Sequence, residues 1–327
     1  MAAGKHSAGA GVLLGIFIAI LFVGAARAQS YPDHPVRLFV PAAAGGPTDI
    51  PARLVSQILP KLGQPGVVEN RPGAGGAIGA RMVASAPADG YSLLVGNTSV
   101  LAVIPATSAS AGYDPTKAFT AVAKVSESYQ ILVLHPSAPW KSVAELIAYA
   151  KTHPGKLTFA HTGVGGLPHL TGELFNSLAG VNILGVPYKS GGESVTAVLG
   201  QQVDMTFESI TILLPLIRDN KLHALAITSR ARTPLAPDLP TMIETGVPDY
   251  EVTTFNGIVA PAGTPKPIVD LLNRTINDGL ASPENKEAIA RLGAISNQGS
   301  PQDFAAFIAA QHRKWLQVAA SAHIKVD

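Results

Sequence analysis

The 327-residue sequence contains no cysteine. This absence excludes disulfide bonds, thiolate metal ligands, a cysteine nucleophile and a lipid-modified amino-terminal cysteine. Charged residues are also scarce, at 14% against 47% hydrophobic residues, so we expect well-filled hydrophobic cores and not a disordered chain. No apolar run after residue 28 is long enough to span a bilayer. The length itself predicts roughly two domains.

The sequence also has no large excess of positive charge. The formal net charge is +2, and the first 28 residues contribute Lys5 and Arg27 without any acidic residue. Their removal leaves a formally neutral chain with no basic stripe, so we expect no nucleic-acid partner. The apolar stretch Val12–Val23 and the small-x-small triplet at residues 26–28 predict a signal peptide over residues 1–28, cleaved before Gln29. An uncleaved anchor is the alternative, but the stretch is short for one. We therefore expect an exported, periplasmic protein.

Motifs for catalysis, metals and cofactors are also lacking. There is no His-Glu-x-x-His, and the nine histidines are scattered. The spacing Gly163-x-Gly165 misses the third glycine of a dinucleotide loop. Asp204 and Glu208 lie near one strand end and form a possible carboxylate pair, although hydrolysis requires a matched acid and base at a cleft. The sequence thus predicts no catalytic residue, no metal site and no cofactor.

Short β-branched runs alternate with amphipathic, helix-length segments along the chain. This rhythm predicts mostly parallel sheets with helices on both sides, arranged as two α/β units. Three further helices at the carboxyl terminus do not clearly belong to the second unit. We expect the chain to leave the first lobe near residue 130 and return near residue 250. The predicted lobes are residues 29–129 plus 252–327, and residues 130–251.

Two glycine-rich loops each connect a predicted strand to a predicted helix. They are residues 41–49 (PAAAGGPTD) and residues 161–169 (HTGVGGLPH). Loops at the carboxyl ends of strands in open α/β sheets bind ligands, and bare amides at a helix start favour an anion. A structural interpretation remains open: the glycines make tight turns, Asp49 only caps its helix, and His169 ties its loop down. A third glycine-rich loop, residues 70–79, is interpreted as structural.

Seven blocks in a fixed order carry a resemblance to a known family. They are "YPDHPVRLFVPAAAGGPTDIPARL", "GQPGVVENRPGAGGAIGA", "ADGYSLLVGN", "GKLTFAHTGVGGLPHLTGELF", "VPYKSGGESVTAVLGQQVDMTFES", "LHALAITSRARTPLAPDLPTMIETGVPDYE" and "GIVAPAGTPKPIVDLLN". Together they resemble the Bug receptors, the extracytoplasmic solute receptors of the tripartite tricarboxylate transporter family. The resemblance covers residues 31–327.

The resemblance implies a two-lobed periplasmic binding protein of type II, the Venus-flytrap kind, in which each lobe is a mostly parallel sheet flanked by helices. It implies a small organic carboxylate held between the lobes by main-chain amides and ordered waters, membrane transporter subunits as partners, and a monomer. It also implies that the position of Asp204 lies at the cleft. The predicted ligand-binding residues are Ala44, Gly45, Gly46, Thr48, Asp49, Asn97, Thr98, Ser99, Thr162, Gly163, Gly165, Gly166, His169 and Asp204.

We therefore predict a solute receptor that closes about a hinge near residues 128–131 and 249–253 and delivers its ligand to a tripartite tricarboxylate-type transporter. Two alternatives are considered. One is a ligand-sensing receptor that docks to a signalling partner. The other is an exported α/β hydrolase with Ser99 or Ser194 as the nucleophile, which the lack of an evident base disfavours.

Overall fold

The computed structural model describes residues 31–326, so the predicted signal peptide lies outside the described residues. In this range the strands form one 10-stranded sheet with the order β2-β1-β3-β9-β4-β7-β5-β6, and β8 and β10 both pair with β4. The strands are β1 (Val36–Val40), β2 (Gly66–Asn70), β3 (Ser92–Asn97), β4 (Phe119–Leu134), β5 (Thr158–His161), β6 (Leu184–Pro187), β7 (Met205–Ser209), β8 (His223–Ile227), β9 (Thr253–Pro261) and β10 (Ala294–Ser296).

Helices follow most of these strands, as the alternating pattern predicts. They are α2 (Asp49–Ile58), α3 (Ala77–Ala84), α4 (Ile104–Thr107), α5 (Pro115–Ala118), α6 (Val143–Thr152), α7 (Leu167–Ala179), α8 (Gly191–Leu199), α9 (Ile210–Arg218), α10 (Lys266–Leu280), α11 (Pro283–Arg291) and α12 (Pro301–Ser321). Serine side chains cap several of them: Ser142, Ser190 and Ser300 each accept a hydrogen bond from the amide three residues on. Among the described residues, no helix is both long and apolar enough to cross a membrane.

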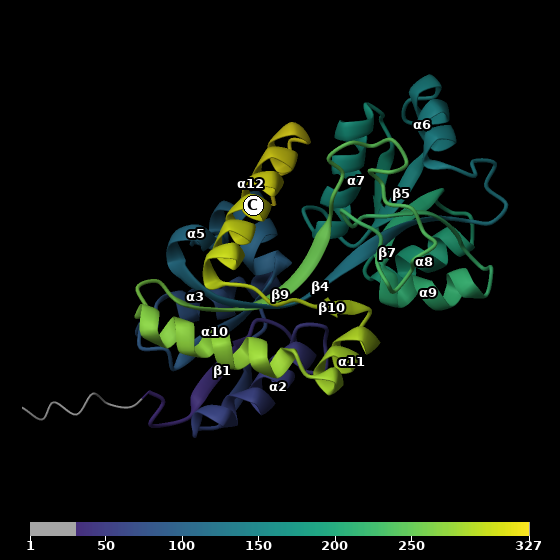
Figure 1. Cartoon of the computed structure of the whole chain (residues 1–327). Helices are drawn as coiled ribbons and strands as arrows, with labels where there is room; N and C mark the ends of the chain where they lie inside the picture. The colour runs from purple at the N-terminus through teal and green to yellow at the C-terminus, as the bar shows by residue number, and fades with distance from the viewer. Residues whose placement is uncertain (1–30, 327) are drawn as a thin grey trace, which may run out of the picture.

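The 16-residue strand β4 connects the two parts of the molecule. Its first part pairs with β9 and β10, and its last residues, from Gln130 on, pair with β7 and β8. In Figure 1, β4 and β9 run between a body that contains β1, α2, α3, α10 and α12 and a body that contains α6, α7, α8 and α9. We call these bodies the first and second lobes. The predicted lobe boundaries, residues 29–129 plus 252–327 and residues 130–251, remain a prediction.

Parallel pairing dominates away from β4. β1 lies between β2 and β3, and β5 lies between β6 and β7, all in parallel. The antiparallel pairs involve β4 or β9. Each lobe therefore contains a parallel βαβ unit of the kind that the sequence pattern predicts, and the strands that join the lobes are antiparallel.

Apolar clusters fill both faces of both lobes. In the first lobe, α2 and α10 cover one face with residues such as Leu54, Ile58 and Leu272, and α3 and α12 cover the other. In the second lobe, α8 and α9 pack on one face and α6 and α7 on the other. This last cluster also contains Trp315 and Val318 of α12, so one hydrophobic core extends across both lobes.

Three features differ from the sequence-based expectation. Residues 119–130 form a strand, the first part of β4, where we expected a strand only from Ile131. Short helical turns occupy residues 99–107 and 115–118, and the three-residue strand β10 was not expected. The spacing of Ile50, Leu54 and Ile58 predicts that all three lie on the buried face of their helix, but Ile50 is 38% exposed, because Ala52 and Val55 lie on that face instead.

Candidate functional site

The strand ends of the two lobes meet at one place, which we call the junction. On β4, Gln130 pairs with Ser209 of β7, and the neighbouring Tyr129 pairs with Thr253 of β9. β7 therefore ends at the level of β4 at which β9 begins, on the opposite edge of β4. Because β5 is parallel to β7 and β3 is antiparallel to β9, the carboxyl ends of β3 and β5 both point to the junction. Parallel pairing orients β1 and β6 in the same way.

The segments that follow these strands are the places where open α/β sheets bind ligands. They include loop 1 (residues 41–48) after β1, the turn at residues 98–99 after β3, and loop 2 (residues 162–166) after β5. Apart from Asp204, the predicted site residues lie in these segments or directly next to them, except that His169 lies in the first turn of α7. The topology thus brings these candidates to one region of the molecule from both lobes.

Loop 1 is shaped by Asp49, the first residue of α2. Its Oδ2 accepts a hydrogen bond from the amide of Gly45 at 2.8 Å and one from Nε of Arg53 at 2.7 Å, and its Oδ1 accepts one from Nδ2 of Asn70 at 2.9 Å. The carboxylate is fully buried. Burial favours the neutral form, but these hydrogen bonds outweigh it and lower the pKa of Asp49. Its oxygens are thus occupied by the protein itself, and Asp49 acts as a brace for the loop.

Other polar groups of loop 1 remain available. The amides of Ala42, Ala43, Ala44, Gly46 and Thr48 have no hydrogen-bond acceptor among residues 31–326. Thr48 is buried, and its Oγ1 accepts a hydrogen bond from Nδ2 of Asn97 at 3.0 Å. Its hydroxyl proton therefore remains free to be donated. Loop 1 presents hydrogen-bond donors that need an acceptor, which is the requirement for holding an anion.

Of the two residues after β3, Thr98 has a structural contact and Ser99 does not. Oγ1 of Thr98 accepts a hydrogen bond from the amide of Phe255 at 2.8 Å, and only 2% of the residue is exposed. Ser99 is partly exposed and begins the helical turn Ser99–Val103. Neither Ser99 nor Ser194, the two nucleophiles of the hydrolase alternative, has a histidine or carboxylate partner within residues 31–326.

Loop 2 is held from within by two histidines. Nδ1 of His161 lies 3.0 Å from the carbonyl oxygen of Gly163, and Nδ1 of His169 accepts a hydrogen bond from the amide of Gly165 at 3.1 Å. The two imidazole rings stack with their centroids 4.3 Å apart. Gly163 and Gly165 have φ angles of +86° and +75°, which favour glycine. His169 thus positions the loop, as the structural interpretation predicted.

The electrostatic character of loop 2 favours neutral histidines. Burial lowers the pKa of His161, and burial together with the neighbouring His161 lowers the pKa of His169 to about 4. Burial also raises the pKa of Glu173, whose Oε1 lies 3.8 Å from Nε2 of His169. The donors that loop 2 offers are again backbone groups, since the amides of Thr162, Gly163 and Val164 have no acceptor among residues 31–326. The hydroxyl of Thr162 and the amide of Gly166 flank them, the latter in a long 3.4 Å bond to Gly163.

Asp204 lies away from these loops. It precedes β7, and its Oδ2 accepts hydrogen bonds from the amide and Oγ1 of Thr158 at 2.8 and 3.0 Å. Both contacts are at the amino ends of β5 and β7, whereas the loops follow the carboxyl ends. The structure therefore does not bring Asp204 to the junction. It also separates Asp204 from Glu208, because the two carboxylates lie at opposite ends of β7, so the pair considered from the sequence does not form.

Two amide side chains near the junction were not singled out from the sequence. Asn256 of β9 donates from Nδ2 to the carbonyl oxygen of Pro47 at 3.3 Å, and thus links loop 1 to the strand that joins the lobes. Gln130 is 4% exposed, and its Oε1 has no partner among the described residues. A polar amide inside an apolar strand is the signal that could have identified both. No cluster of three or more metal-ligating side chains occurs in residues 31–326.

Comparison with known families gives a match to the family described as "Tripartite tricarboxylate transporter family receptor" over residues 52–323. The chain is similar to protein BugT of Bordetella pertussis, with 38% identity over 309 residues that cover 94% of this chain and 95% of BugT. The similarity to BugT therefore extends over nearly the whole length of both sequences.

Solved structures of similar proteins have the same fold. An R. palustris protein with adipate has 36% identity and a TM-score of 0.73, covering 90% of this chain and 99% of that protein. MatC from Rhodopseudomonas palustris with bound malate has 34% identity and a TM-score of 0.70, covering 88% of this chain and 99% of MatC.

Proposed function

Since this chain belongs to the tripartite tricarboxylate transporter receptor family, whose members are non-catalytic solute receptors with a periplasmic binding protein fold, we propose that it binds a small organic carboxylate at the junction. The family and the fold predicted from the seven sequence blocks are confirmed. The hydrolase alternative is wrong for this family.

The observation that carries the proposal is the set of unpaired amides in loops 1 and 2. Five N–H groups of loop 1 and three of loop 2 have no acceptor among the described residues, and the loops come from different lobes. Oriented N–H groups next to a helix start stabilise negative charge without a cationic side chain. A carboxylate held in this way has no ion pair to break on release, which suits a receptor that must pass its ligand on.

The ligands of the similar proteins support this chemical class. One relative was solved with adipate and another with malate, and both compounds are dicarboxylates. We infer that the carboxylate of the ligand contacts loops 1 and 2, with Gly46, Thr48, Gly163 and Thr162 as the central contacts. We further propose that the protein is exported by its predicted signal peptide. It then delivers the ligand to the membrane subunits of a tripartite tricarboxylate-type transporter.

Ligand-induced stabilisation of the mature protein tests the proposal. The protein is unfolded thermally in the presence of a panel of monocarboxylates and dicarboxylates that includes adipate and malate. A ligand that binds only the folded state at about 100 times its Kd stabilises it by about 2.7 kcal/mol, so at least one acid is expected to raise the unfolding temperature. Amines and neutral sugars of similar size serve as controls. The absence of any shift with every organic anion would contradict the proposal.

A further inference from the structure

Glu208 is a buried acid that no described residue neutralises. Only 8% of the residue is exposed, and Oε1 accepts a hydrogen bond from the amide of Ser209 at 2.8 Å. No ion pair within residues 31–326 includes it, and burial raises the pKa of its carboxyl group. Buried acids of this kind are rare without a partner, so the position requires an explanation.

The register of the sheet places Glu208 beside loop 2. β7 is parallel to β5, and Ala160 pairs with Thr206. Two residues further along both strands, Glu208 therefore lies next to Thr162, the first residue of loop 2. On its other side, Glu208 pairs with Ile131 of β4, one residue from the junction residue Gln130. Glu208 thus lies at the same sheet edge as the proposed carboxylate-binding amides.

The start of α8 lies against the free oxygen of Glu208. A β-carbon added to Gly191 would lie 2.4 Å from Oε2 of Glu208, so only glycine permits this approach. Ser194, one helical turn along the same face of α8, is fully buried, and its Oγ has no partner among the described residues. Oε2 of Glu208 has no hydrogen-bond partner among residues 31–326, and the hydroxyl of Ser194 is a second polar group near the start of α8 that lacks one.

We propose that Glu208 accepts a hydrogen bond from a donor group of the ligand, such as a hydroxyl or amide N–H, and that the site therefore favours such a group over a second carboxylate. This inference rests on the proposed function. A donor would give Oε2 the partner that it lacks. A second carboxylate would bring two negatively charged acceptors together beside a side chain that is largely buried, where the repulsion of like charges is less screened than in water.

A matched ligand series tests the selection. Isothermal titration calorimetry of the mature protein is carried out at mildly alkaline pH with adipate, its monoamide, and the ω-hydroxy acid of equal chain length. The wild-type protein is expected to bind the hydroxy acid and the monoamide about tenfold or more tightly than adipate. In Glu208→Gln, whose side-chain amide donates to a carboxylate, this preference is expected to fall toward equality or reverse. A wild-type protein that prefers adipate overturns the inference.

Two neighbouring glycines provide the control for folding effects. In Gly191→Ala the added methyl group collides with the Glu208 carboxylate, whereas in Gly192→Ala the nearest atom is Oγ of Ser190 at 3.9 Å. We expect the preference to be reduced in Gly191→Ala and retained in Gly192→Ala. An unchanged preference in both Glu208→Gln and Gly191→Ala overturns the inference while the proposed function stands. Failure of the wild-type protein to bind any member of the series and of the larger acid panel contradicts the proposed function itself.

Discussion

The Oδ2 atom of Asp49 accepts a hydrogen bond from the amide of Gly45, 2.8 Å away. This bond closes loop 1 onto the first turn of α2. The same oxygen is held by Nε of Arg53, and the other oxygen by Nδ2 of Asn70. Since every other amide donor of the loop is left without an acceptor, the shape of loop 1, and hence the direction of its free N–H groups, depends on one buried carboxylate.

Asp49→Ala is therefore expected to weaken ligand binding on the order of tenfold or more and to destabilise the protein by about 1 to 3 kcal/mol, because it removes the hydrogen bonds that the carboxylate accepts from Gly45, Arg53 and Asn70. Asp49→Asn keeps one acceptor oxygen, so its affinity and stability should lie between those of Asp49→Ala and the wild type. Calorimetric titration and chemical unfolding measure the two effects. Wild-type affinity in Asp49→Ala would show that the brace is not needed.

Gly163→Ala is expected to reduce ligand affinity because the φ angle of +86° at this position disfavours any residue with a side chain. Gly180, which ends α7 with a φ angle of +63°, is the matched control, since neither glycine has an atom within 4 Å of an added β-carbon. Both variants should lose about 1 to 2 kcal/mol of stability. Only Gly163→Ala should bind the ligand more weakly. Equal affinities for the two variants would remove loop 2 from the site.

His169 is expected to make the stability of the protein sensitive to mild acid. Burial and the neighbouring His161 lower the pKa of His169 in the folded protein to about 4, from 6.5. The unfolded chain therefore binds more protons between these values, and the free energy of unfolding falls as the pH drops from about 6.5 to about 4, by up to roughly 3 kcal/mol. Protonation at Nδ1 also removes the acceptor for the amide of Gly165.

This pH dependence is measured by chemical unfolding of the wild type and of His169→Gln across that pH range. The stability of the wild type relative to the variant should be constant above about pH 6.5 and decrease below it. Glu173, the carboxyl group next to His169, is present in both proteins, so its own titration largely cancels. A constant difference across the whole range would show that His169 titrates in the same way in the folded and unfolded states.

Asp204→Ala is expected to change stability without changing ligand preference. Its carboxylate holds the amide and hydroxyl of Thr158 at the amino ends of β5 and β7, far along the strands from loops 1 and 2. Loss of these bonds should cost about 1 to 3 kcal/mol, and Asp204→Asn should cost less because an acceptor remains. Affinities for the acid panel are measured in parallel. An altered ratio of affinities would support the ligand role that the resemblance implied for this residue.

Local patterns were sufficient to predict most of the helices and strands. The run Val36–Val40, the segment Ala77–Ala84 and the capping serine Ser142 are identifiable because burial, spacing and capping act within a few residues. Residues 119–130 were harder. They mix apolar with polar residues such as Lys124 and Glu127. The burial of this part of β4 changes along the strand: most side chains are buried near its start, and several are only partly buried near Glu127.

The site was predictable only in part, for a related reason. Glycine-rich turns after strands identify loops 1 and 2, since the backbone conformation itself requires glycine there. Which side chains lie near them depends on the pairing order of strands far apart in the sequence. Asp204 and Glu208 are four residues apart on one strand, yet only strand direction decides that Glu208, and not Asp204, lies at the junction.

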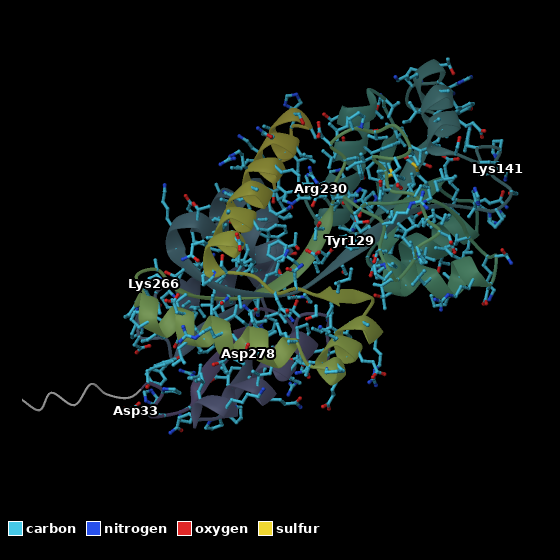
Figure 2. All side chains as sticks on the ribbon, in the orientation of Figure 1. Asp33, Tyr129, Lys141, Arg230, Lys266 and Asp278 are labelled. Carbon is cyan, nitrogen blue, oxygen red and sulfur yellow. The ribbon has the colours of Figure 1, made fainter. Side chains whose placement is uncertain are left out.

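The packing of α12 limits how the two lobes can move. Trp315 and Val318 of this helix share one apolar cluster with Leu174 and Phe175 of α7, while Phe304 at its other end is buried against the first lobe. In Figure 2, the labelled residues Tyr129 and Arg230 lie between α12 and the second lobe. A large rotation between the lobes would separate the side chains of this cluster and leave a cavity in a close-packed core, which is unfavourable. We therefore expect the two lobes to close by a small rotation about the hinge segments that keeps this shared cluster packed.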